Sequence, residues 1–174
     1  MTVVRGLALA ALGAVAVLAS AGCGDDDSSD DQAAGEGAAY VERASAICRE
    51  GVREAKRIGK RSQNVDPGNL ELITAIFIRP GISLLERQAE RLRGIDAPPE
   101  DEAYHTYVGL YDPAIELVRR RVEAARAGDI AEAQNVGTYM DQLGADSREA
   151  ARAAGLADCD VDIARTMVLA AAGE

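Results

Sequence analysis

The sequence predicts an all-α domain built as an antiparallel up-down-up-down four-helix bundle. From residue 38 onward the apolar residues recur at steps of three and four, which is the period of an amphipathic helix, and no stretch alternates with a period of two. Clusters of proline, glycine and asparagine divide this pattern into four segments with short connections. Because short connections favour antiparallel neighbours, the up-down-up-down topology is the expected one.

Residues 1–22 have the features of a lipoprotein signal peptide that ends at Cys23. Arg5 precedes the apolar run 7–19, which suits a signal-peptide core and is shorter than the about 20 apolar residues of a membrane-spanning helix. The small residues before Cys23 resemble a bacterial lipobox, although Ser20 stands where the usual motif has a branched aliphatic residue. We therefore expect Cys23 to carry the lipid and the protein to lie on the outer face of the cell membrane. Plain secretion and a retained membrane anchor are the alternatives.

The three cysteines fit the same interpretation. An odd number of thiols is unfavourable in an oxidising compartment. If Cys23 is lipidated, Cys48 and Cys159 remain as a pair that is free to form one disulfide. The predicted topology places the end of the fourth helix beside the early part of the first, where such a bond would form. Three unrelated buried cysteines are the alternative.

Residues 23–38 are predicted to form a disordered acidic tether. Aspartates dominate 25–31, alanine and glycine dominate 32–37, and no periodic apolar positions are present. Such a segment cannot bury enough apolar surface to fold. We expect a solvated spacer, with cation binding by the aspartates as the alternative, and a helical bundle over 39–159.

The first two helices are predicted over 39–62 and 70–94, with turn residues at 64–69 between them. The first helix is locally basic, and we expect its charged face to be solvated and salt-bridged. Contact with anionic lipid or cell-wall polymer, extended by residues 119–121, is the alternative. The apolar faces of the two helices contain Val41, Ala44, Cys48, Ala55 and Ile58, and Leu70, Ile73, Phe77, Leu84, Leu85 and Leu92.

The third and fourth helices carry clear start and stop signals. Pro98 and Pro99 separate the second helix from the third, whose first turn is acidic, as the helix dipole favours. Gly128 ends the third helix, and Asp129 begins the fourth, which continues to residue 155. The tail 160–174 either docks as a short helix or frays. The stripe of the third helix alternates steps of four and three, the seam spacing of bundle packing: Tyr104, Val108, Tyr111, Ile115, Val118, Val122 and Ala125.

Two prolines interrupt the second and third helices. Pro80 and Pro113 each remove one backbone hydrogen bond, so each helix should kink or restart there, with Asp112 as a new N-cap for the third helix. The two positions are equally distant from the hairpin midpoint, which predicts kinks at the same level. Paired kinks can open a pocket for a small ligand, and the predicted lining is Phe77, Tyr107 and Tyr111. The alternative is that both helices simply bend around the core.

The composition excludes several function classes. A net charge of −10 argues against a nucleic-acid partner, which needs a basic surface. Glu102 and His105 have the Glu-x-x-His spacing, but a di-iron site needs this motif on two helices and the chain has one histidine. A mononuclear site that adds Asp101 is the alternative to a surface histidine. No Ser-His-Asp set or phosphate-binding loop can be named, so we expect no catalysis, no cofactor and no metal.

Four short segments, in their order and spacing, resemble a group of small actinobacterial exported proteins and lipoproteins without established activity. The resemblance implies a helical domain closed by a bridge between Cys48 and Cys159. The segments are ASAIC at 44–48, RGIDAPPE at 93–100, AGD at 127–129 and GLADC at 155–159.

These observations predict a lipid-anchored extracytoplasmic protein that acts by binding or structural association. Its partners would be the membrane, reached through the lipid, and an unknown protein or component of the cell envelope. The alternative function is a small-ligand or metal carrier that uses the pocket at the kinked hairpin of the second and third helices.

Overall fold

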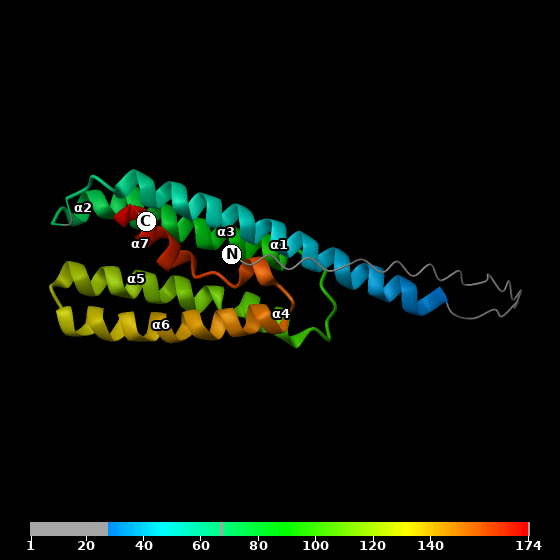
Figure 1. The fold of residues 1–174 in the computed structure, drawn as a ribbon. Helices are drawn as coiled ribbons and strands as arrows, with labels where there is room; N and C mark the ends of the chain where they lie inside the picture. Colours follow the sequence, from blue (N-terminus) through cyan, green and yellow to red (C-terminus); the bar gives the residue numbers. More distant parts are fainter. Residues whose placement is uncertain (1–27, 67, 174) are drawn as a thin grey trace, which may run out of the picture.

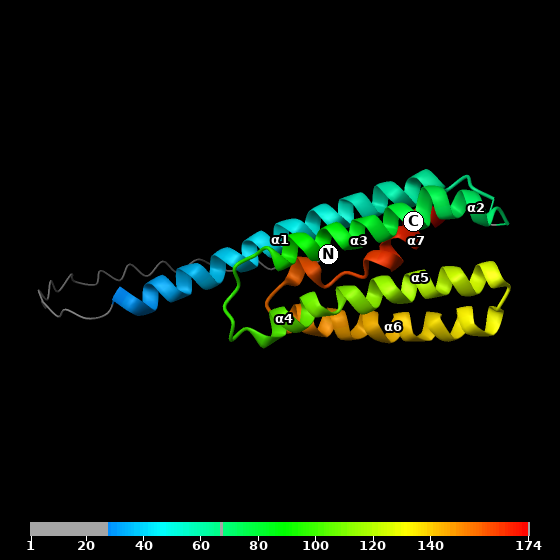
Figure 2. The same cartoon turned by 180° about the vertical axis from the view of Figure 1, so that it is seen from behind.

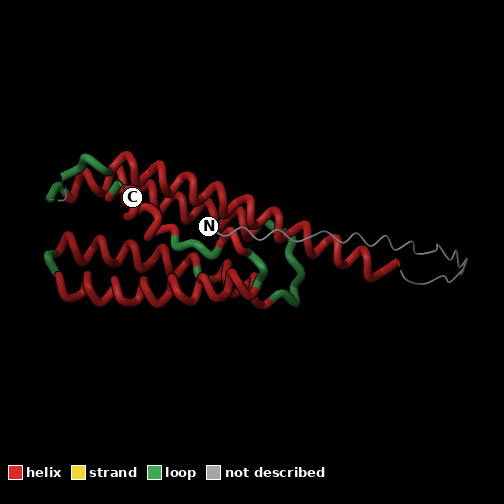
Figure 3. The backbone as a smooth tube through the Cα atoms, in the orientation of Figure 1, coloured by secondary structure: helices red, strands yellow, loops and turns green. Residues whose placement is uncertain are grey.

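The computed structural model of the protein describes residues 28–66 and 68–173, and all regular structure in these residues is helical (Figure 3). The predictions for residues 1–22 and for Cys23 lie outside the described residues. The all-α fold class is confirmed. The elements are α1 (Ser28–Ser62), α2 (Leu70–Ile73), the π-helix η1 (Thr74–Ile78), α3 (Arg79–Arg93), α4 (Glu102–Gly109), α5 (Tyr111–Ala127), α6 (Ile130–Ala153), the 3₁₀-helix η2 (Ala157–Cys159) and α7 (Ile163–Ala172).

The long helices form two antiparallel pairs, with α7 between them (Figures 1 and 2). α1 packs along α3, and α5 packs along α6. The two pairs meet through α3 and α5, while α7 lies against α1. α7 adds a packed helix that the four-helix expectation does not contain.

The first helix begins earlier than its sequence predicts. α1 starts at Ser28, although residues up to 38 were expected to be a disordered tether. In the segment 32–39 the helix-favouring alanine, glutamine and glutamate residues outnumber the two glycines. These local preferences extend the helix beyond the packed domain (Figure 1).

Both prolines coincide with departures from α-helical geometry. Before Pro80 the helix widens into the π-helical stretch η1, in which the N–H of Arg79 bonds to the carbonyl of Thr74. Before Pro113 the helix is interrupted at Leu110, which separates α4 from α5. The prediction that Asp112 is the N-cap of this helix is wrong, because Leu110 is the N-cap. Asp112 lies in the first turn and pairs with Arg93 at 2.7 Å. Since Pro113 has no N–H to donate one turn back, the interruption falls before it and not at it.

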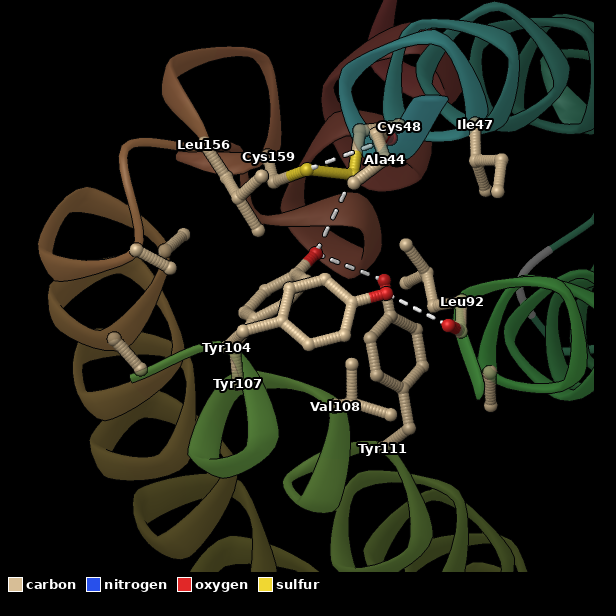
Figure 4. Packing of buried hydrophobic residues seen from close by; sticks show 14 of the residues in the cluster. Ala44, Ile47, Cys48, Leu92, Tyr104, Tyr107, Val108, Tyr111, Leu156 and Cys159 are labelled. Carbon is tan, nitrogen blue, oxygen red and sulfur yellow. Dashed lines mark hydrogen bonds between the residues drawn. A yellow bond between two sulfur atoms is a disulfide. The ribbon is translucent and has the colours of Figure 1, made fainter. Parts of the chain in front are cut away.

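A disulfide closes the domain. Cys48 in α1 is bonded to Cys159 in η2, with the Cα atoms 5.1 Å apart across a sequence separation of 111 residues (Figure 4). The chain returns to α1 through Gly155, whose φ of 69° ends α6 in the left-handed conformation that glycine adopts without a steric cost. The N–H of Leu156 then bonds to the carbonyl of Ala151 at 2.8 Å. This turn directs Cys159 toward α1.

The disulfide is expected to supply a large share of the stability. In the chain-entropy model a loop of this length stabilises the fold by about 4–5 kcal/mol. Replacing both cysteines, Cys48→Ala with Cys159→Ala, should lower the free energy of unfolding by about that amount, measured by urea titration of the helical circular dichroism. Adding a reductant to the natural chain should reproduce the loss and leave the double variant unchanged. A loss below about 1 kcal/mol would contradict the entropic role of the bond.

Candidate functional site: an apolar cavity beneath α7

A cavity of about 350 Å³ lies between α3 and α5 and is bordered by α7. This volume falls within the range of about 300–1,000 Å³ that is typical of small-molecule sites. The α2 to α3 segment contributes Leu70, Ile73, Phe77, Ile78, Gly81 and Ile82. The opposite wall contains Val118, Val122, Ala125 and Met140, and α7 contributes Ile163, Ala164, Met167 and Val168. Arg121 is the one ionisable side chain among the lining residues.

Two glycines allow α7 to approach the other helices closely. A Cβ atom at Gly59 of α1 would lie 2.4 Å from the carbonyl oxygen of Met167, and one at Gly81 of α3 would lie 2.6 Å from the Met167 methyl carbon. The side-chain amide of Gln63 also donates to the carbonyl of Ala170 at 2.8 Å. A larger residue at Gly59 would meet the backbone of α7 and displace this helix, whereas one at Gly81 would meet only the flexible end of the Met167 side chain.

A smaller cavity of about 100 Å³ adjoins the first. Both cavities are lined by Leu85, Val118, Met140, Ile163 and Ala164. Tyr107 and Tyr111 line the smaller cavity, while Phe77 lines the larger one. The three residues predicted to share one pocket therefore lie in two neighbouring cavities.

The two prolines do not face each other across the hairpin. Asp112, next to Pro113, pairs with Arg93 at the end of α3 at 2.7 Å. The residue after Pro80, Gly81, shares the larger cavity with Val118 and Val122. The prediction of kinks at one level assumed pairing centred on residues 96 and 97, but the pairs Arg93–Asp112 and Glu86–Arg119 centre the pairing of α3 with α5 on residues 102 and 103. The cavity therefore lies beside the break at Pro80, with the helix wall of α5 opposite.

The tyrosines form a buried cluster at the disulfide (Figure 4). The hydroxyl of Tyr107 lies 2.9 Å from that of Tyr111 and 3.6 Å from the sulfur of Cys48. Tyr104 donates to the carbonyl of Leu92 at 2.7 Å. Burial raises the pKa of Tyr104 to about 12 and raises the pKa of Tyr111 well above its usual value. These hydroxyls are neutral at physiological pH and act as structural hydrogen-bonding groups.

The residues of the hypothetical mononuclear metal site have other roles. Asp101 caps α4 by accepting from the N–H of Tyr104 at 2.9 Å, and it also accepts from the hydroxyl of Tyr40. Burial, followed by the Asp101 hydrogen bond, raises the pKa of Tyr40 to about 12. His105 is exposed, and a nitrogen of its ring lies 3.1 Å from the carbonyl of Pro98. Across residues 28–66 and 68–173, no three acidic, histidine or cysteine side chains gather in a metal-binding cluster.

The glutamates of α1 form salt bridges mainly with the neighbouring helix. Glu50 accepts from Arg91 of α3 at 2.7 Å, and Glu54 pairs with Arg87 of α3 at 3.1 Å. Arg49 pairs with Asp158 next to the disulfide. Because all of these groups are partly exposed, each pair contributes modestly to stability.

Sequence reasoning did not assign α7 or Arg121 to the site. The signal for α7 was present in the tail: the side chain of Asp162 caps the helix by accepting from the N–H of Arg165 at 2.8 Å. Met167 and Ala170 follow at helical spacing and are buried. Arg121 stands within a run of three arginines, and no sequence signal distinguishes it from its neighbours.

The chain matches no protein-family model, no curated protein sequence and no solved structure. A search of the described part of the chain finds no helix with the length and apolar character needed to span a bilayer.

The tyrosine cluster predicts a loss of stability at high pH. An unfolded tyrosine ionises near pH 10, whereas the folded cluster retains its protons because the pKa values of Tyr40 and Tyr104 are raised to about 12. The contribution of the buried tyrosines to the free energy of unfolding is complete below about pH 10. It is lost as the pH rises further, because the unfolded state then binds fewer protons than the folded state. The free energy of unfolding should fall between about pH 10 and 12, as measured by urea titration at each pH.

The matched variants are Tyr104→Phe and Tyr139→Phe. Tyr104 is 2% exposed and Tyr139 is 59% exposed. Removing the buried hydroxyl should make the decline above pH 10 shallower, while removing the exposed one should leave it unchanged. Equal slopes for both variants and the natural chain would show that the cluster does not control the alkaline transition.

Proposed function

We propose that the protein is a lipid-anchored, extracytoplasmic binding protein that holds a small apolar ligand in the cavity beside α7 and performs no catalysis. The observation that carries this proposal is the cavity of about 350 Å³, whose walls are apolar except for Arg121. Apolar ligands gain free energy when their surface leaves water, and a largely preformed cavity limits the ordering cost of binding. The groups that line the cavity are typical of binding and not of acid–base chemistry.

Two features support a location outside the cytosol. The sequence of residues 1–23 has the order of a lipoprotein signal followed by its cysteine. The Cys48–Cys159 bond belongs to a type that persists in oxidising compartments. In this proposal the lipid on Cys23 holds the domain at the outer face of the membrane, in agreement with the resemblance to actinobacterial exported lipoproteins.

The proposal includes an up-down-up-down frame formed by α1, α2 to α3, α4 to α5, and α6. Support comes from the antiparallel pairs and from the short connections between consecutive segments. α7 would then be an added helix that lines the ligand cavity formed within this frame.

The cavity is tested with a neutral apolar fluorophore, 1-N-phenylnaphthylamine, whose emission rises when it leaves water. Ala125 lines the cavity and Ala127 lies on the same helix outside it, and both positions are exposed, so a larger side chain can be accommodated at either. Ala125→Phe should weaken probe binding about tenfold by filling the cavity, and Ala127→Phe should not. Both substitutions make the same chemical change, so equal probe binding by the two variants and the natural chain would refute the cavity as the site.

The anchor is tested by metabolic labelling with palmitate in a bacterial host that processes lipoproteins. The natural chain should incorporate label and remain with the membrane fraction. Cys23→Ala should remove the label, whereas the control Cys48→Ala with Cys159→Ala should retain it. Label that persists in the Cys23→Ala variant would refute the lipid attachment.

A further inference from the structure

Three consecutive arginines of α5 have different surroundings. Arg119 donates to Glu86 of α3 at 2.7 Å, and Arg120 donates to Glu132 of α6 at 2.6 Å. Arg121 lines the larger cavity and has no carboxylate within 4 Å among the residues that the structure describes. Successive helical residues point about 100° apart, so the three side chains leave the helix in different directions. The charge of Arg121 thus lies at the apolar cavity without a neutralising partner in the described part of the chain.

The Arg121 guanidinium lies beside Gly137 of α6. A Cβ atom at Gly137 of α6 would lie 3.7–3.9 Å from the Cζ and Nη atoms of Arg121, which is ordinary van der Waals contact. The guanidinium therefore lies over a part of α6 that carries no side chain. Arg121 is exposed to solvent, so its N–H donors are accessible to a ligand head group at the cavity rim.

From this arrangement we infer the ligand class: a single-chain amphiphile with an anionic head, either a carboxylate or a phosphate. The inference rests on the proposed function of the cavity. The alkyl chain occupies the apolar cavity, and the head group accepts hydrogen bonds from Arg121. A guanidinium presents paired donors that match the oxygens of carboxylates and phosphates, and such charge-assisted bonds are stronger than neutral ones.

The size of the cavity favours one chain over two. Its volume of about 350 Å³ lies near the lower end of the usual range of about 300–1,000 Å³. The cavity is also accessible from outside, because Val168 on its wall is 57% exposed. A single alkyl chain can enter there while its head stays near the rim.

The experiment compares decanoate, decyl phosphate and decan-1-ol, which share one chain length and differ in the head group. Each is titrated against the full chain loaded with the neutral fluorophore, in a fluorinated surfactant that does not compete for alkyl sites. Displacement should be about tenfold stronger for an anion than for the alcohol. Arg121→Gln should remove this advantage and leave the alcohol unchanged, and added salt should reduce it in the natural chain.

Arg126→Gln is the matched control. Arg126 is exposed on the same helix, has no salt bridge in the described residues and does not line the cavity. It should leave all three affinities unchanged. An advantage seen only for decanoate identifies a carboxylate head, and one seen only for decyl phosphate identifies a phosphate head.

The failure of this inference is distinguishable from the failure of the proposed function. If anions and alcohol bind equally, or if Arg121→Gln and Arg126→Gln have the same effect, the anionic ligand class is overturned while apolar binding stands. If the natural chain binds neither the fluorophore nor any of the three amphiphiles, the proposed function fails as well.

Discussion

The covalent bond between Cys48 and Cys159 is the constraint on which the remaining structure depends. The core around it combines four buried tyrosines with many alanines, including Ala44, Ala89 and Ala151. Alanine lets helices approach closely but buries little apolar area, so packing alone provides limited stability. The bond joins the early part of the domain to its end across 111 residues. The bond therefore restricts the unfolded chain and adds stability to a core in which many alanines bury little apolar area.

The same bond determines where the last helix lies. Once η2 is attached to α1, the chain restarts at the Asp162 cap and α7 continues along α1. The close approach at Gly59 and Gly81 then holds Met167 beside the cavity. The candidate site therefore includes the last helix of the domain, whose position depends on a bond that lies outside the site. A domain stabilised in this way can leave an apolar cavity incompletely filled, which a core supported by packing alone tolerates less well.

Much of the fold could be predicted from local signals, and much of the site could not. Helical periodicity, the proline and glycine boundaries and the two domain cysteines were sufficient for the all-α class and the disulfide. The level of Pro80 relative to Pro113 depends on how the connection 94–101 is arranged, which no local signal determines. The docking of α7 depends on a glycine more than one hundred residues earlier in the chain, at Gly59. Tyr107 and Tyr111 line the smaller cavity and Phe77 the larger one, and this division follows from tertiary packing.

The arginines of α5 show why a candidate site can be invisible in a sequence. Residues 119–121 are chemically identical, and only their tertiary partners separate them. Arg119 and Arg120 lie near Glu86 and Glu132, so their charges are neutralised between helices. For Arg121 the neighbouring position on α6 is Gly137, which offers neither a carboxylate nor a bulky side chain. Arg121 is exposed and has no carboxylate partner in the described residues, so an anionic head can pair with its charge while the alkyl chain fills the cavity. The ligand class therefore follows from what the neighbouring helices leave unpaired.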